Sequence, residues 1–181
     1  MSPAPHVRRE LRPGDLGAII EHHGRVYACE HGVDSTFEGF VAAGVADAAR
    51  RGYPSEREAV WIVELDGRHA GSLGLTDEGD GIAALRWFLL DPAIRGRGLG
   101  RSLVAELIER ARELGYTLVR LETFSALTTA ARIYRDFGFD LVSEETGPRW
   151  GRDEVTFQRY EVALGSLAAP GGTQELVREH G

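Results

Sequence analysis

IRGRGLGRS, residues 94–102, places three glycines and three arginines between an apolar run and a long segment of helical periodicity. Glycine carries no side chain, so the backbone N–H groups of such a turn can approach a ligand closely. The helix predicted to follow adds about half a positive charge at its N-terminus. A solvated glycine-rich turn is the alternative, but open backbone, helix end and arginines together favour a phosphate-binding loop.

The segments on either side of this loop predict a strand–helix–strand unit. IAALRWFLL, residues 82–90, is an almost continuous apolar run that ends at an Asp-Pro pair, as expected for a strand buried on both faces. Apolar residues then recur at helical spacing over residues 99–114, and Gly115 ends the predicted helix. TLVRLETF, residues 117–124, is the next strand. A single helix between two strands makes them parallel, with a right-handed crossover.

The remaining segments predict strands and helices on both sides of this unit. Asp15 and Ser35 are the predicted N-caps of two helices near the N-terminus. Two β-rich runs joined by Asp66-Gly67 form a hairpin, and Gly138 ends a short helix. The further predicted strands are residues 7–11, 59–65, 68–76, 139–146 and 155–164. The predicted fold class is α/β (α+β), in the order βααβββαβαββ, with a mixed, mostly antiparallel sheet of about seven strands and about four helices.

Length and composition are those of one globular domain. The chain has 181 residues, of which 43% are hydrophobic and 27% charged. We assign the domain to residues 6–164 and expect flexible tails at residues 1–5 and 165–181, where turn-forming residues gather. The N-terminal segment lacks the apolar stretch of a signal peptide, and no apolar run is long enough to span a membrane, so we expect a cytoplasmic protein. Cys29, the only cysteine, is expected to be buried, and we predict no metal site.

The net charge of −7 disfavours nucleic acid and anionic membranes as partners, because the far field repels polyphosphates. An anionic ligand therefore needs a local positive site. All 21 basic residues are arginines, which fits genome composition, although arginine also provides forked donors for phosphate.

Three nucleotide-binding patterns compete for the glycine loop. A dinucleotide fingerprint requires its third glycine one residue after Gly100, and it requires a strand that ends directly before the first glycine. A P-loop requires four residues between its glycines and then lysine, whereas Gly96 and Gly100 are separated by three and arginine follows. The third pattern, Arg-x-x-Gly-x-Gly, is matched in full by Arg95, Gly98 and Gly100.

That third pattern, here LLDPAIRGRGLGRSLV, resembles the coenzyme-A-binding segment of the GNAT (Gcn5-related) N-acetyltransferase superfamily. A second segment, ARIYRDFGF, resembles the Tyr-x-x-x-Gly-Phe motif of the same family. The body is also similar to the acetyltransferase half of bacterial MarR–GNAT fusions, in HHGRVYA, REAVWIVELDG and YTLVRLETFSALTTAARIYRDFGFDLV. The resemblance covers the whole predicted domain and implies the GNAT fold, in which strands four and five splay apart.

The resemblance also implies how acetyl-CoA is bound. Backbone amides of the loop would hold its pyrophosphate, and backbone groups of the preceding strand would pair with its pantetheine arm and donate to the thioester oxygen. One position departs from the family pattern, since Leu127 stands where many relatives carry a coenzyme-contacting asparagine; Ser125 is the candidate substitute. The implied cofactor-binding residues are Phe88, Leu89, Leu90, Arg95, Gly96, Arg97, Gly98, Leu99, Gly100 and Arg101.

Two residues are the catalytic candidates. Tyr134 matches the family's usual acid, which gives a proton to the departing thiolate; spacing alone also fits a core tyrosine. Glu122 stands where some relatives carry a basic carboxylate, and a solvated carboxylate or one beside Arg120 is the alternative. Other candidate bases are Glu38, Glu64, His22, His23 and an ordered water. The two adjacent histidines diverge on a helix, which excludes a two-ligand metal face and favours surface or packing positions. Trp150 is expected on a loop that rims the acceptor pocket.

These features predict an N-acetyltransferase that moves an acetyl group from acetyl-CoA directly to a primary amine. A small-molecule acceptor is favoured over a protein, because the chain has no extra recognition domain. The family resemblance also implies that a homodimer can form. A noncatalytic acyl-CoA-binding or sensory module, and a nucleotide-binding protein, are the alternatives.

Overall fold

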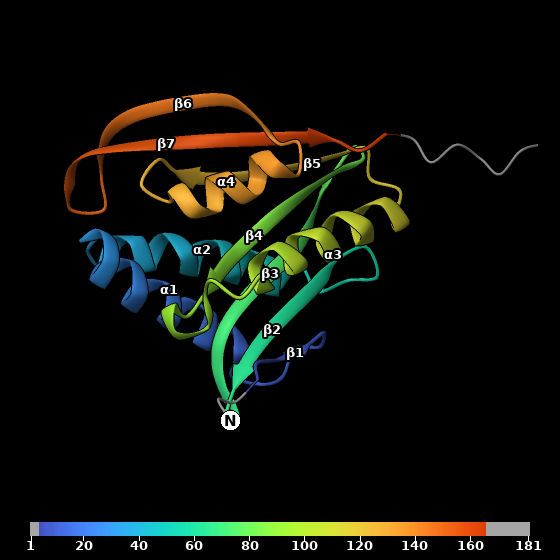
Figure 1. Ribbon diagram of the computed structural model, residues 1–181, viewed down its shortest axis with the longest axis horizontal. Helices are drawn as coiled ribbons and strands as arrows, with labels where there is room; N and C mark the ends of the chain where they lie inside the picture. The colour runs from blue at the N-terminus through green and yellow to red at the C-terminus, as the bar shows by residue number, and fades with distance from the viewer. Residues whose placement is uncertain (1–3, 166–181) are drawn as a thin grey trace, which may run out of the picture.

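Seven strands form a single sheet in the order β1-β2-β3-β4-β5-β7-β6 in the computed structural model, which describes residues 4–165 (Figure 1). The strands are β1 (His6–Arg8), β2 (Ala59–Leu65), β3 (Arg68–Gly79), β4 (Ile82–Leu90), β5 (Leu118–Phe124), β6 (Asp140–Arg149) and β7 (Arg152–Ala163). The helices are α1 (Asp15–His31), α2 (Ser35–Arg50), the 3₁₀ turn η1 (Pro92–Ile94), α3 (Leu99–Glu113) and α4 (Thr128–Asp136). This order confirms the predicted fold class. The predicted tails lie outside the described residues, except for residues 4, 5 and 165.

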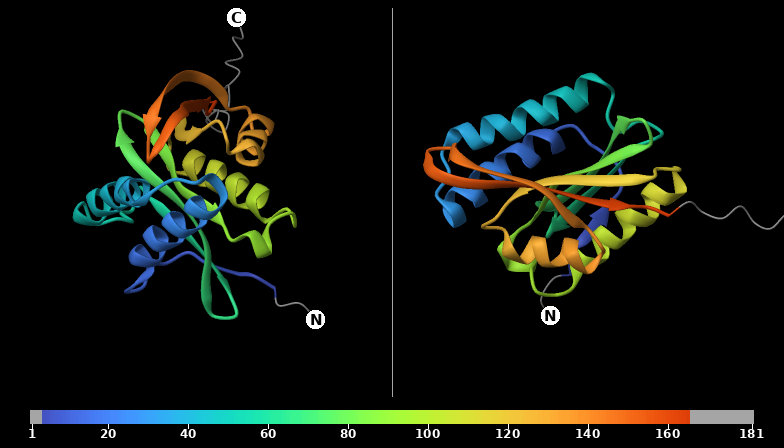
Figure 2. Two further views of the ribbon diagram at one scale, coloured as in Figure 1. Left: turned by 90° about the vertical axis from the view of Figure 1, so that its left-hand side faces the viewer. Right: turned by 90° about the horizontal axis from the view of Figure 1, so that it is seen from above.

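The helices cover both faces of the sheet. α1 and α2 lie on one face, and α3 and α4 lie on the other (Figure 2). Each pair buries its own apolar cluster: Leu103 and Leu107 of α3 pack with Leu121 of β5, while Val41 of α2 packs with Ile62 of β2. The sheet is thus the middle layer of three. None of the helices between residues 4 and 165 is long and apolar enough to cross a membrane.

β4 and β5 are the parallel pair, and they stay together for only part of their length. Their register runs from Ile82 opposite Leu118 to Leu85 opposite Leu121 and then stops. Both strands continue, β4 to Leu90 and β5 to Phe124, so their facing edges are unpaired beyond that point. The splay that the family resemblance implied is therefore present.

A bulge in β4 marks the start of the splay. Ser72 of β3 is opposite Leu89, and Gly74 is opposite Arg86. Two residues of β4, Trp87 and Phe88, therefore face the single β3 residue Leu73. Trp87 lies in this bulge with a φ of +49°, and its carbonyl accepts a hydrogen bond of 2.7 Å from the Ser72 hydroxyl. A Cβ at Gly74 would lie 2.8 Å from the Trp87 ring, so the strand can bend here only because position 74 has no side chain.

Several local predictions were wrong at helix ends. Asp15 is the first residue of α1 and not its cap, which is Gly14 at a φ of +98°; the Asp15 carboxylate instead pairs with Arg8 at 2.9 Å. The cap of α2 is Asp34, one residue before the predicted Ser35, and it accepts a hydrogen bond of 2.9 Å from the Thr36 N–H. Both aspartate and serine favour this position, so the choice depends on where the preceding chain turns.

Side-chain exposure on α1 contradicts the prediction for Cys29 and decides between the two positions, surface or packing, that were predicted for the histidines. Cys29 is exposed, because the buried stripe of the helix passes through Ile19, His23 and Val26 and leaves position 29 outside it. His22 and His23 are both buried, at 1% and 5% exposure, so they are packing residues and not surface residues. The first strand is shorter than predicted, His6–Arg8, because only these residues pair with β2.

Candidate active site

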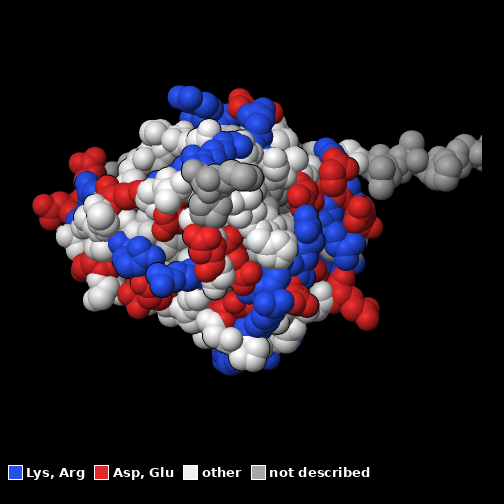
Figure 3. Space-filling view, turned by 60° about the horizontal axis from the view of Figure 1, so that its bottom comes forward, with Lys and Arg blue, Asp and Glu red and all other residues white. Residues whose placement is uncertain are grey.

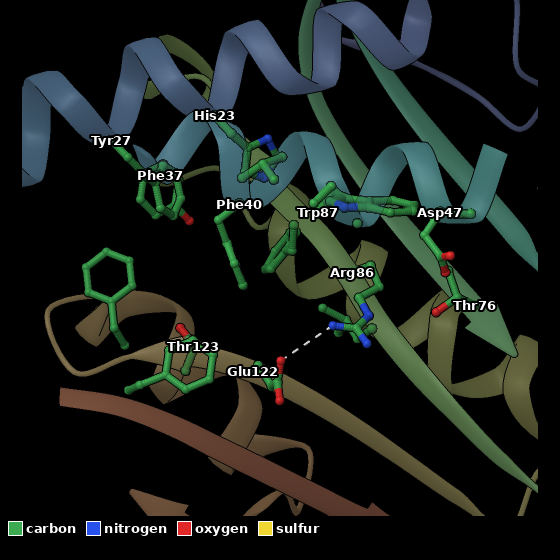
Figure 4. Close-up of a pocket in the computed structure, with 18 of the residues that line it drawn as sticks. His23, Tyr27, Phe37, Phe40, Asp47, Thr76, Arg86, Trp87, Glu122 and Thr123 are labelled. Carbon is green, nitrogen blue, oxygen red and sulfur yellow. Dashed lines mark ion pairs between the residues drawn. The ribbon is translucent and has the colours of Figure 1, made fainter. Parts of the chain in front are cut away.

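Two cavities meet where β4 and β5 separate. The first, here called the α2 cavity, has a volume of about 600 Å³ and lies between α2 and the sheet (Figure 4). The second, here called the loop cavity, has a volume of about 590 Å³ and lies beside the glycine loop. Tyr27, Phe88 and Leu127 line both cavities, so these residues stand at the junction. The two cavities therefore share a wall made by these three side chains.

The glycine loop forms an open backbone cradle at the N-terminus of α3. Gly96 and Gly98 have φ values of +76° and +80°, a region that glycine enters without strain, and a Cβ at either would have no atom within 4 Å. Gly98 is the N-cap of α3 and offers no side chain to its first turn, so the N–H groups there are left for a ligand. At Gly100 a Cβ would lie 3.2 Å from the Phe88 ring, which shows how closely α3 approaches β4. These features fit a diphosphate.

The arginines around this loop are partly neutralised. Arg95 donates to both carboxylate oxygens of Glu30, at 2.8 and 3.0 Å, and to the Leu90 carbonyl, so it ties the loop to α1 and β4. Arg101 pairs with Asp136 at 2.6 Å. The face drawn in Figure 3 likewise intermingles arginines with acidic side chains. Positive potential for an anion therefore depends on the loop backbone and the helix end as much as on side chains.

The cofactor-binding residues proposed from the resemblance are mostly brought to the loop cavity. Those that line it are Phe88, Leu89, Leu90, Arg95, Gly96, Gly98, Gly100 and Arg101. Arg97 and Leu99 do not, although they belong to the same loop. Ser125, the candidate substitute for the missing asparagine, lines neither cavity, whereas Leu127 lines both.

Tyr134 projects from α4 to the wall of the α2 cavity and is 4% exposed. Its ring packs near Phe88, Phe139 and Tyr160, with centroid distances of 6.3, 5.8 and 6.2 Å. Burial raises the pKa of its hydroxyl far above the ordinary value, with smaller contributions from Tyr27 and Tyr160. The phenol therefore keeps its proton at neutral pH and can serve only as a proton donor there.

Glu122 lies on β5 just beyond the end of the pairing with β4 and extends into the same cavity. Arg159 on β7 donates to it at 2.9 Å, and Arg86 on β4 lies 3.6 Å away across the splay (Figure 4). Arg120 pairs instead with Glu78 and Glu161, so it is not the partner of Glu122. The carboxylate thus forms part of a charged floor that bridges the two strands.

His23 is a further ionisable group on the wall of the α2 cavity. Its Nδ1 lies 2.8 Å from the Ile19 carbonyl, which can only accept, so Nδ1 carries the hydrogen and Nε2 has the lone pair. Burial lowers the pKa of His23 to about 4, which keeps the ring neutral at physiological pH. The ring stacks on Tyr27, with centroids 5.8 Å apart. His22 and the other candidate bases, Glu38 and Glu64, do not line either cavity.

Sequence reasoning missed three residues at the site: Tyr27 at the junction, Arg86 on the floor and Phe40 on the wall. Arg86 had a signal, because it is the only charge within an otherwise apolar strand. Tyr27 and Phe40 follow helical periodicity like any core residue, so nothing in the sequence separates them from packing positions. Trp150 lies on the cavity wall, as expected, and is 9% exposed.

Sheet order, splay and glycine cradle together define an acyl-coenzyme-A-dependent transferase. The sequence profile of the acetyltransferase (GNAT) family matches residues 25–139, and the chain belongs to this family. The uncharacterized N-acetyltransferase YjgM of Escherichia coli strain K12 is 32% identical over 150 residues, which cover 81% of this chain and 89% of YjgM. The uncharacterized N-acetyltransferase YhbS of the same strain is 30% identical over 160 residues, covering 77% and 90%.

Solved structures show the same fold. The structure of yncA from Salmonella typhimurium with its cofactor acetyl-CoA has a TM-score of 0.63 at 22% identity and covers 94% of this chain and 99% of its own. An acetyltransferase of the GNAT family from Streptococcus pneumoniae has a TM-score of 0.66 at 18% identity and covers 90% and 100%. The protein is accordingly an acyltransferase of the GNAT superfamily whose cosubstrate is acetyl-CoA.

Proposed function

We propose that this enzyme moves the acetyl group of acetyl-CoA directly to the primary amine of a small molecule. The junction of the two cavities at Tyr27, Phe88 and Leu127 is the observation that carries this proposal. The loop cavity receives the coenzyme and the α2 cavity receives the acceptor, so the two reactants meet inside one protein at the splay. Such placement removes the entropic cost of a bimolecular encounter, and a covalent enzyme intermediate is not needed.

The coenzyme supplies an acetyl group activated as a thioester. The N–H groups of residues 96–101 hold its diphosphate, and the unpaired edge of Phe88, Leu89 and Leu90 pairs with its amide-bearing arm as an added strand. A backbone N–H of this edge also stabilises negative charge that develops on the acyl oxygen.

Two side chains handle protons. Tyr134 Oη gives its proton to the leaving sulfur, since the phenol on the cavity wall is protonated at neutral pH. A Glu122 carboxylate oxygen attracts the acceptor ammonium and takes its proton, directly or through water. His23 Nε2 is the alternative acceptor of that proton, because its lone pair is fixed by the bond that Nδ1 makes to Ile19.

A small acceptor suits a cavity of about 600 Å³, which is within the range of small-molecule sites. We place the enzyme in the cytoplasm, as the sequence led us to expect, and the family resemblance implies that a homodimer can form. Sedimentation of the purified chain measures the second point.

The test is release of free thiol from acetyl-CoA in the presence of a panel of primary amines, measured with a thiol reagent. Turnover that falls in both Tyr134→Phe and Glu122→Gln supports the proposal. Binding of acetyl-CoA without turnover of any amine would favour a noncatalytic acyl-CoA sensor. A larger thermal shift with ATP or NAD than with coenzyme A would favour a nucleotide-binding protein.

A further inference from the structure

One end of the α2 cavity is built from aromatic rings. Five of them form what is here called the aromatic wall: Phe37 and Phe40 of α2, Phe124 of β5, Trp150, and Phe157 of β7. Trp150 is at its centre, with ring centroids 4.9 Å from Phe37, 5.4 Å from Phe40 and 5.6 Å from Phe124. The segments that meet here come from far apart in the sequence, so the wall exists only in the folded protein.

Phe40 is the member of this wall that packing does not explain. It is 48% exposed, whereas Phe37 and Val41, its neighbours on α2, are buried at 5% and 6%. Its side chain points from α2 into the cavity (Figure 4). A half-exposed phenylalanine beside Trp150 and Phe157 offers apolar surface that a ligand ring can cover, at the 4.5–7 Å spacing that aromatic pairs prefer.

The other end and floor of the cavity are charged. Four carboxylates and two guanidinium groups line it: Asp47, Asp77, Glu78, Glu122, Arg51 and Arg86. Each carboxylate is in an ion pair, and the partners of Asp77, Glu78 and Glu122 include arginines from outside the lining: Arg57, Arg120 and Arg159. The charges of the lining are therefore balanced. Glu122, on the floor at the splay, is the carboxylate that an acceptor ammonium can approach.

We propose that the acceptor is a primary amine that carries an aromatic ring, with the ring against Phe40 and Trp150 and the ammonium near Glu122. This inference rests on the proposed function, since it assigns the acceptor to the α2 cavity. It goes further by naming the class of molecule and the residue, Phe40, that selects it.

The test compares two amines with acetyl-CoA: 2-phenylethylamine and ethanolamine. Thiol release should have a kcat/KM at least tenfold higher for 2-phenylethylamine than for ethanolamine, the discrimination expected when one ring finds an apolar pocket. Phe40→Ala should lower kcat/KM for 2-phenylethylamine about tenfold, mainly through KM, and should lower it much less for ethanolamine, so that the preference is lost. Leu141→Ala is the matched control, because Leu141 is similarly exposed, at 45%, but lies on β6 outside the cavity.

The possible results separate this inference from the proposed function. Equal turnover of ethanolamine and 2-phenylethylamine, or an unchanged preference in Phe40→Ala, overturns the inference and leaves acetyl transfer to small amines intact. If no amine of the panel causes thiol release, the proposed function is overturned, and the inference with it.

Discussion

Replacing Tyr134 by phenylalanine should abolish most of the turnover and leave the fold intact. The substitution removes one oxygen and keeps the ring that packs near Phe88, Phe139 and Tyr160. The pKa of this hydroxyl is raised mainly by burial, so deleting it also removes a polar atom from a poorly solvated site. We therefore expect the unfolding free energy to change by less than about 1 kcal/mol.

The effect on rate follows from the role assigned to Tyr134 Oη. A positioned general acid contributes a factor of about 10² to 10⁴, which corresponds to roughly 3–5 kcal/mol of activation free energy. The assay is thiol release with 2-phenylethylamine as acceptor, together with calorimetric titration of coenzyme A, whose affinity should not change. Tyr160→Phe is the control, because Tyr160 is equally buried at 4% but lines neither cavity. A loss of kcat smaller than about threefold in Tyr134→Phe, or an equal loss in the control, would refute the assignment.

Three further predictions concern stability and binding. Arg95→Ala should lower the unfolding free energy by about 1 kcal/mol and weaken coenzyme A binding in calorimetry, since it removes the tie to α1, whereas Arg97→Ala is the control that should change neither, because its side chain lines neither cavity. In urea denaturation, Asp34→Ala should cost about 1 kcal/mol by deleting the α2 cap, and Ser35→Ala only a few tenths. His23 has a folded-state pKa of about 4 against the ordinary 6.5, so the unfolded chain binds the proton more readily. The unfolding free energy should therefore fall by about 3 kcal/mol as the pH drops from 6.5 to 4. His23→Gln should remove this contribution to the pH dependence, as measured by denaturation curves across that pH range.

The order of strands and helices was predictable because local patterns and tertiary packing agree over most of the chain. The apolar run of β4, the turn at Asp66-Gly67 and the periodicity of α3 each point to the element that forms. Helix caps were less predictable, since Asp34 and Ser35 both suit the position. The bulge at Trp87 had no signal of its own, because its positive φ is imposed by Ser72 and by the room left at Gly74.

The candidate site likewise has one part that the sequence predicts and one part that it does not. Its loop was readable, because glycine spacing and a helix start are local features that sequence records directly. The α2 cavity was not, because its walls come from α1, α2, β4, β5 and the β6–β7 turn, whose approach depends on the whole fold. That Phe40 and Tyr27 line the cavity follows only from how these elements pack together, which the sequence does not show. The pairing of Glu122 with Arg159 required the register of β5 against β7, which no local pattern specifies.

Because β4 and β5 pair over only a short length, the unfolding free energy of the chain depends on the molecule that fills the gap between them. The β4–β5 ladder that joins the two halves of the sheet runs from Ile82–Leu118 to Leu85–Leu121, and a molecule that fills the gap beyond it adds its binding energy to the folded state alone. At a free concentration one hundred times its dissociation constant, such a molecule adds about 2.7 kcal/mol. Bound acetyl-CoA should therefore make unfolding of the chain rarer than it is in the free protein.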